Sequence, residues 1–232
     1  MAGTRPEGSL ARTHQGKPGL PRGRNGLPLR AVQASHRQRL QASVIAAVAE
    51  ASYHAVTVAD IVRGARVSRS VFYAHYAHYA DKEDCFLAAT REGGRLMSGR
   101  MASATRAVPP GAPEEQALRA AFLAYLTFLA DEPAFARAAY VYAPTAGPMA
   151  AEQLDAATRR IADLNRKWHA RARSRHPEWP SVPGDAYQAL SGASHELIRS
   201  IVRAEQTEAL PDLEGTLMSL HMAVLADRPW TA

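Results

Sequence analysis

Apolar residues recur every three or four positions along much of the chain, which is the spacing of one face of an α-helix. The first clear stretch runs from about Ser35 to Ser52, and its apolar positions are Leu40, Val44, Ala47, Val48 and Ala51. Runs with strand-type alternation are scarce, whereas alanine and leucine, which favour helices, are abundant. The pattern therefore predicts an all-α protein.

Two short helices are predicted after the first one. Thr57 is placed as a helix N-cap, and Asp60 follows three residues later in a variant of the capping box. The inner face of this helix is formed by Ile61, Val62 and Ala65. Ser68 is the next cap, so a third helix begins at Arg69. Three short helices with a tight last turn indicate a helix-turn-helix unit, whose last helix enters the major groove of DNA.

The rest of the chain is predicted to be helical, with breaks at prolines. A long fourth helix is expected from Asp84 to about Ala107, and Gly93–Gly94 in its middle is either a packing contact or a flexible point. Residues 114–130 are apolar nearly all round, which predicts a central buried helix.

The last two predicted helices carry long apolar stripes. Their spacing of three and four residues is shown by two series, Tyr187, Leu190, Ser194, Leu197 and Ile201, then Leu210, Leu213, Leu217, Leu220 and Val224. Two such helices from each of two subunits can close a four-helix bundle about a twofold axis. Burial within one chain explains the pattern too, and both interpretations stay open at this point.

The net charge of +6 is concentrated at the amino terminus. Residues 1–39 hold eight basic side chains and one acidic one, whereas the other 193 residues hold 20 basic and 21 acidic side chains. A Gly-, Pro- and Arg-rich arm of this kind cannot bury enough apolar surface to fold alone. It is either a solvated tail or a cationic arm that neutralises phosphates or enters a minor groove, with Arg22 and Arg24 as candidates.

Other features narrow the class of protein. The single cysteine, Cys85, excludes a disulfide framework and a cysteine-based zinc site. No secretory signal is visible, and the most apolar run, residues 120–130, is too short for a membrane span. A cytoplasmic location is therefore expected. Glycine-rich phosphate loops, nucleophile elbows and metal-ligand spacings are not found, so neither an enzyme nor a cofactor is predicted.

About residues 37–90 show a family resemblance. They include "SVIAAVAEASYHAVTVADIVRGARVSRSVFYAHYAHYADKEDCFLAA", which resembles the DNA-binding region of the TetR (tetracycline-repressor) family of bacterial transcriptional regulators. The most specific parts are "TVADI", "VSR", "FYAHY" and "DKE". A later stretch, "FLADEPAFARAAYVYAPTAGP", is similar to the variable regulatory half of the same family. The resemblance implies a helix-turn-helix domain at 35–83 after a disordered basic arm at 1–34. It also implies a helical regulatory and dimerisation domain at 84–232.

The resemblance also implies roles for single residues. Positions that face base edges in the family are held by Arg69, Ser70 and Ala74, and the arginine fork suits guanine. Positions that hold phosphates are occupied by Thr57, Ser68, Tyr73, His75 and Lys82. A solvated arginine is the simpler alternative for Arg69, and core packing is the simpler alternative for Tyr73.

The chain departs from the family pattern at three places. Ala-His-Tyr occurs twice in tandem, at 74–76 and 77–79, where the family has one copy. The extra residues either lengthen the third helix, with Phe72, Tyr76 and Tyr79 on one face, or are taken up in the next turn. His75 and His78 do not complete a metal-ligand set. Ser52 and Arg66 replace glycines of the family, and a positive φ there would cost about 1 kcal/mol or more.

An apolar effector pocket is expected in the regulatory half, where methionine and aromatic residues suit such a ligand. Its candidate wall is Leu96, Met97, Met101, Phe122, Tyr125, Phe128, Tyr140 and Trp168, although each of these also suits an ordinary core. The favoured interpretation is a homodimeric regulator, most often a repressor in this family, that a small molecule releases from a near-palindromic operator. The alternative is a helical ligand- or protein-binding dimer that has lost operator affinity. The basic run 159–175 is explained best as a solvated helix face.

Overall fold

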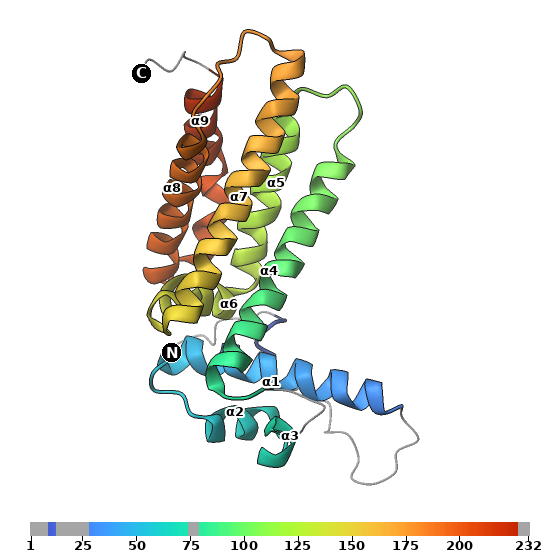
Figure 1. The fold of residues 1–232 in the computed structure, drawn as a ribbon, viewed down its shortest axis with the longest axis vertical. Helices are drawn as coiled ribbons and strands as arrows, with labels where there is room; N and C mark the ends of the chain where they lie inside the picture. The colour runs from blue at the N-terminus through green and yellow to red at the C-terminus, as the bar shows by residue number, and fades with distance from the viewer. Residues whose placement is uncertain (1–8, 13–27, 74–78, 227–232) are drawn as a thin grey trace. The chain divides into compact units, whose positions relative to one another are not determined.

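The computed structural model describes residues 9–12, 28–73 and 79–226. Every regular element among these residues is helical (Figure 1), which confirms the all-α prediction. In chain order they are α1 (Leu29–Ala51), α2 (Val58–Ala65), α3 (Arg69–Tyr73), α4 (Lys82–Ala107), α5 (Glu114–Asp131), α6 (Pro133–Arg137), the π-helix η1 (Ala138–Tyr142), the 3₁₀ helix η2 (Ala143–Thr145), α7 (Pro148–Arg175), α8 (Gly184–Arg203), the 3₁₀ helix η3 (Thr207–Leu213) and α9 (Glu214–Leu225).

The chain divides into two compact units. Unit 1 comprises residues 1–93 and 132–151, and unit 2 comprises residues 94–131 and 152–232. Helices α6, η1 and η2 therefore pack with the first three helices, and both α6 and η1 contact α1. Residues 132–151 follow a long helical stretch in the sequence, so periodicity alone gave no reason to place them in the same unit as α1.

The core of unit 1 forms where α1 packs against α2. The inward positions predicted for α1 are correct at Leu40, Val44 and Val48, which are fully buried, and Ile61 and Phe72 join them from α2 and α3. Helix α1 begins at Leu29 rather than near Ser35, so the last part of the expected arm is helical. Residues 29–34 read Leu-Arg-Ala-Val-Gln-Ala, which are mostly good helix formers and extend the helix back to Pro28.

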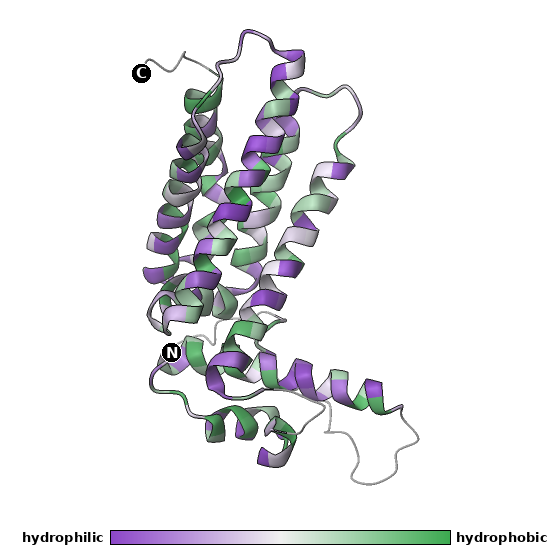
Figure 2. Ribbon diagram, in the orientation of Figure 1, coloured by the Kyte–Doolittle hydropathy of each residue, from purple (hydrophilic) through white to green (hydrophobic). Residues whose placement is uncertain are grey.

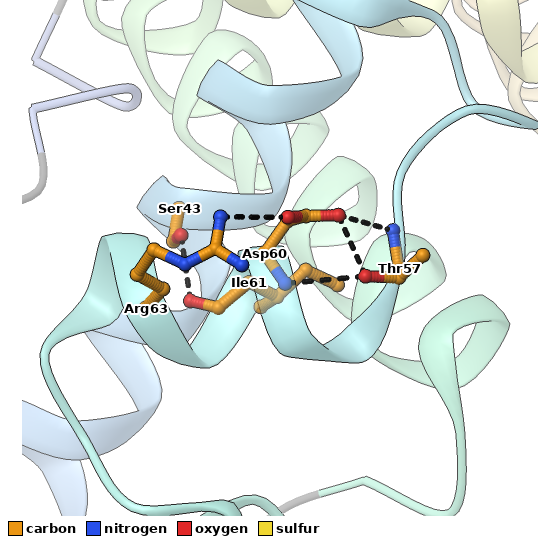
Figure 3. Close-up of polar contacts among 5 residues, drawn as sticks. All are labelled: Ser43, Thr57, Asp60, Ile61 and Arg63. Carbon is orange, nitrogen blue, oxygen red and sulfur yellow. Dashed lines mark hydrogen bonds and ion pairs between the residues drawn. The ribbon is translucent and has the colours of Figure 1, made fainter.

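A close approach between α1 and α2 depends on a glycine. A Cβ atom at Gly64 would lie 2.3 Å from the Ser43 hydroxyl oxygen, so only glycine fits this position without a shift. The buried Ser43 hydroxyl donates a hydrogen bond to the Ile61 carbonyl at 2.8 Å (Figure 3). This bond ties the two helices together and satisfies a polar group inside the core.

The core of unit 2 is built around α5, which packs against η3 and α9. Leu126 and Leu129 of α5 are fully buried, as the prediction of a central helix requires. The stripe predicted as one helix from Leu210 to Val224 is divided, because η3 ends at Leu213 and α9 begins at Glu214. Pro211 lies inside η3 and lacks an N–H group, which explains why an α-helix does not run through this point.

Hydrophilic and hydrophobic bands alternate along α7 (Figure 2), as expected for a helix with one solvated face. Of its basic side chains, Arg166 pairs with Asp163 at 2.6 Å and Arg175 pairs with Glu114 at 2.5 Å. Among the described residues, no helix has both the length and the apolar character that a membrane span needs.

Candidate nucleic-acid interface

Helix α2 begins with the capping box that the sequence predicts (Figure 3). The Asp60 backbone N–H donates to the Thr57 hydroxyl at 3.3 Å, and the Thr57 backbone N–H donates to the Asp60 carboxylate at 3.0 Å. The Thr57 hydroxyl itself donates to the same carboxylate, and this bond lowers the pKa of Asp60. Thr57 is exposed at the start of the helix, where a phosphate could reach it.

The tight turn after α2 has the strain that the sequence predicts. Arg66 has φ 50° and ψ 44°, which is the left-handed helical region, and its N–H donates to the Arg63 carbonyl at 3.1 Å. The Val67 N–H closes the turn by donating to the Val62 carbonyl at 3.1 Å. At the end of α1, Ser52 has φ 78° and ψ 159°, a region that essentially only glycine populates. Both non-glycine residues therefore adopt a positive φ.

Helix α3 turns a polar face to solvent. Its first turn is capped by Ser68, whose hydroxyl accepts the Val71 N–H at 3.3 Å and contacts the Ser70 hydroxyl at 2.7 Å. Arg69 and Ser70 are exposed, and Tyr73 keeps 48% of its surface exposed, whereas Phe72 is fully buried. Core packing is therefore the wrong interpretation for Tyr73. The short helix holds Arg69 and Tyr73 outward by anchoring itself through Phe72.

Lys82 does not extend into solvent. Its ammonium group donates to the carbonyls of Tyr53 at 2.9 Å and Val56 at 2.8 Å, and it lies 4.2 Å from the centre of the Tyr53 ring. Partial burial lowers the pKa of Lys82. The first residue of α4 is thus tied to the loop between α1 and α2. The sequence missed this role, because nothing local to Lys82 indicates a contact with residues about 30 positions earlier.

Tyr79, the last residue of the Ala-His-Tyr repeat, is tied back to α3. Its N–H donates to the Phe72 carbonyl at 3.2 Å, and its buried ring lies 5.7 Å from the Phe72 ring. In a continuous helix, seven residues would separate the two backbones by about 10 Å along the axis. Of the two alternatives left open for the extra residues, a continuous α3 that carries Phe72 and Tyr79 on one helical face is therefore wrong.

Several predicted residues lie outside the part of the chain that the structure describes. These are Arg22, Arg24, Ala74, His75, Tyr76 and His78. Their proposed contacts with DNA stay predictions. Within the described residues, no group of three or more His, Cys, Asp or Glu side chains is arranged to hold a metal ion.

Residues 45–89 match the family model of bacterial regulatory proteins of the TetR family. The match spans the end of α1, both helices of the helix-turn-helix unit and the start of α4. The chain therefore carries the amino-terminal region of the TetR family. No curated protein sequence matches it.

Solved structures extend the likeness to most of the chain. The fatty acid degradation regulator FadR from Bacillus halodurans is 15% identical with a TM-score of 0.70, covering 81% of this chain and 94% of that chain. FadR from Bacillus subtilis, solved with stearoyl-CoA, is 14% identical with a TM-score of 0.67, covering 80% and 97%. A TetR family regulatory protein from Rhodococcus RHA1 is 18% identical with a TM-score of 0.63, covering 83% and 98%. At these identities the likeness shows the TetR fold.

The predicted effector-pocket residues are distributed over both units. Tyr140 is buried in unit 1, and the other seven belong to unit 2. Of those seven, Phe122, Tyr125, Phe128 and Trp168 are buried, Met97 and Met101 are half-buried, and Leu96 is exposed. The Phe122 ring lies 4.7 Å from the ring of His221, and the Trp168 indole donates to the Glu114 carbonyl at 3.1 Å.

A surface groove of about 300 Å³ lies elsewhere in unit 2. It runs between α4 and α5 and is lined by Arg100, Ala104, Ala120, Leu123, Ala124 and Thr127, none of which the sequence singled out. Leu123 is 47% exposed, and the Arg100 guanidinium pairs with Asp131 at 2.9 Å. The groove arises because alanines leave room beside an exposed leucine. The sequence does not indicate this groove, because residues 114–130 are apolar nearly all round and their periodicity does not distinguish small from large side chains.

The predicted dimer residues also differ in their surroundings. Tyr187, Leu190 and Leu217 are buried within the single chain, and the Tyr187 hydroxyl is 2.8 Å from His169 Nδ1. Leu217, with 0% of its surface exposed, has no side-chain surface left for a partner. Leu197 is 36% exposed, and the remaining predicted residues are half-buried, namely Ile201, Leu213, Leu220 and Val224.

Proposed function

We propose that the protein is a sequence-specific DNA-binding transcriptional regulator that acts in the cytoplasm as a homodimer, as a repressor of a near-palindromic operator. The observation that carries this proposal is the exposed face of α3, where Arg69, Ser70 and Tyr73 are held outward by the buried Phe72. An arginine at the start of such a helix can donate two hydrogen bonds to guanine. Thr57 and Ser68, at the starts of α2 and α3, supply hydroxyls for phosphates.

The dimer contact is proposed along α8 and α9. Both helices expose small residues on one side, namely Ala189, Gly192, Ala193 and Ser200 on α8 and Gly215, Thr216, Ser219 and Ala223 on α9. Small side chains allow helix axes to approach closely, and the exposed Leu197 provides an apolar anchor. Two α3 helices related by a twofold axis then require a near-palindromic site on the DNA.

We propose an apolar effector with an acyl chain. FadR from Bacillus subtilis has been solved with stearoyl-CoA, and its fold resembles that of this chain. The groove between α4 and α5 combines apolar walls with the guanidinium of Arg100, which would exchange its pairing with Asp131 for an anionic head group. An effector that binds one conformer better shifts the population away from the operator-binding form.

A second candidate function is a TetR-like dimer whose operator binding is weak or lost. The strained Ser52 and Arg66 favour it. Ser52 ends α1 and Arg66 ends α2, so both lie at turns that position the helices of the DNA-binding unit. In this alternative the protein would still dimerise and bind a ligand.

A binding selection from genomic fragments, with the purified protein at a stated salt concentration, separates the two candidates. Recovery of one near-palindromic motif supports the regulator, whereas retention that is blind to sequence and sensitive to salt supports the alternative. Arg69→Ala should relax the preference at one base position, and Arg63→Ala, a nearby exposed arginine paired with Asp60, serves as the control. Release of the bound fragment by stearoyl-CoA but not by CoA would support the acyl effector.

A further inference from the structure

A buried glutamate on unit 1 binds the amino-terminal segment of the chain. Glu132 is only 3% exposed and precedes α6, but its carboxylate does not cap that helix. Instead, Glu132 Oε1 accepts the Ser9 N–H at 3.0 Å, and Glu132 Oε2 accepts the Leu10 N–H at 2.8 Å. The Ser9 hydroxyl also donates to Oε1. Two successive backbone N–H groups that point at one carboxylate form an anion-binding nest.

The segment also contributes an apolar contact. Ala11 follows the two donors and is 1% exposed, so its methyl group is buried. A buried carboxylate is costly unless hydrogen bonds compensate for its lost hydration. The segment of Ser9, Leu10 and Ala11 and the burial of Glu132 are therefore energetically coupled. Detaching the segment removes three donors from a charge that water cannot easily reach.

The position of Glu132 is fixed by α6. Phe135, one turn further on, packs so closely on α4 that a Cβ atom at Gly93 would lie 2.1 Å from the Phe135 ring. Glu132 is the N-cap residue of α6, but its side chain makes no hydrogen bond to the first turn of that helix. The carboxylate is thus left available for donors from elsewhere in the chain.

We propose that Glu132 is a docking site for residues 9–11, through which the basic arm is attached to unit 1 at a second point besides its covalent junction with α1. A negative charge at position 9 opens this attachment, because it would lie directly beside the buried Glu132 carboxylate. Attachment at two points raises the effective concentration of the arm beside the DNA-binding helices. The effect of the attachment on DNA binding rests on the proposed DNA-binding function, whereas the docking itself does not.

Hydrogen exchange of the full-length protein, followed by mass spectrometry of the amino-terminal peptide, tests the docking without DNA. In the unmodified protein the amides of Ser9 and Leu10 should exchange at least about 10-fold more slowly than in a free peptide. Ser9→Asp and Glu132→Leu should abolish this protection. Ser9→Ala removes only the hydroxyl bond and should retain part of it. Glu50→Gln, which removes an exposed carboxylate from the same unit, should leave it unchanged.

Exchange at the free-peptide rate in the unmodified protein would overturn the proposal, as would protection that survives Glu132→Leu. Should Glu132→Leu disturb α6, the result with Ser9→Asp decides, because Ser9 is exposed and its replacement leaves the core of unit 1 intact.

The consequence for DNA is measured with a duplex of fixed length at several salt concentrations. Glu132→Leu and Glu50→Gln both remove one negative charge, so their difference reports the lost attachment rather than the charge. We expect Glu132→Leu to bind the duplex about 3- to 10-fold more weakly than Glu50→Gln, without a change in base preference. Equal binding of the duplex by the two variants would overturn the proposed effect of the attachment on DNA binding. It would not alter the conclusion from hydrogen exchange. Failure to recover any operator would instead count against the proposed function.

Discussion

The Lys82 ammonium group lies 2.8 Å from the Val56 carbonyl oxygen, and this bond joins the first residue of α4 to the loop that leads into α2. A second bond to the Tyr53 carbonyl and the face of the Tyr53 ring complete the surroundings of the cation. The resemblance to the TetR family implies a phosphate contact for this lysine. In the free protein the same ammonium group holds the α1–α2 loop on α4.

Lys82→Met should lower the free energy of unfolding by about 1–3 kcal/mol, because it keeps the aliphatic stem and leaves two carbonyls without their charged donor. Urea unfolding of the purified protein measures the change. Lys167→Met, at an exposed position of α7, is the matched control and should change little. A variant that keeps its stability but binds all DNA sequences more weakly would show that Lys82 acts on phosphates alone.

The two strained residues predict a stabilising pair of substitutions. Ser52 occupies a region near φ 78° and ψ 159° that is open essentially only to glycine, whereas Arg66 occupies the milder left-handed helical region. Ser52→Gly should therefore raise the stability by about 1–2 kcal/mol, and Arg66→Gly by less than about 1 kcal/mol. Thermal unfolding would rank them. The opposite order, or a loss of stability in both, would show that side-chain contacts outweigh the backbone strain.

Neighbouring glycines in α4 should respond in opposite directions to alanine. A Cβ atom at Gly93 would lie 2.1 Å from the Phe135 ring, whereas a Cβ atom at Gly94 has no atom within 4 Å. Gly93→Ala should destabilise the protein by about 1–3 kcal/mol through overpacking. Gly94→Ala should stabilise it by about 0.5–1 kcal/mol, because alanine is the better helix former. Two variants that change stability equally would contradict the close contact with Phe135.

Local chemistry made the helix-turn-helix unit predictable from the sequence. Thr57, Asp60 and Ser68 act within three residues along the chain, so their spacing alone specifies the caps. The positive φ at Ser52 and Arg66 was predictable for the same reason, since a turn constrains its own residues. Periodicity also identified the buried face of α1 and the central position of α5.

Contacts between distant segments could not be predicted in this way. The periodicity of the stripe containing Leu217 predicts an apolar face but does not say whether it packs on its own subunit or on another. Glu132 and Ser9 are 123 residues apart, and neither shows a local signal for the other. The sequence left open whether Tyr79 continues a helical face, and the hydrogen bond from its N–H to the Phe72 carbonyl, which a continuous helix does not allow, could not be predicted from the spacing.

A buried histidine in unit 2 makes stability depend on pH. His221 is fully buried, its Nδ1 donates to the Leu217 carbonyl at 2.8 Å, and its Nε2 lies 3.2 Å from the Asn165 amide nitrogen. Since that amide group is the donor, Nε2 is an acceptor and the ring is neutral. Burial lowers the pKa of His221 from 6.5 to about 4.

The unfolded chain therefore takes up this proton first as the pH falls. Stability from the neutral ring is fully present above about pH 6.5 and is lost between about pH 6.5 and pH 4, by about 3 kcal/mol in all. His221→Gln can still accept from Asn165 and has no titrating group, so its unfolding free energy should fall less between pH 7.5 and pH 5. His169, whose pKa burial also lowers, should leave part of the slope in place. Urea unfolding measures the change in unfolding free energy with pH. The same change in the unmodified protein and in His221→Gln would mean that His221 is already protonated, or hydrated, in the native state.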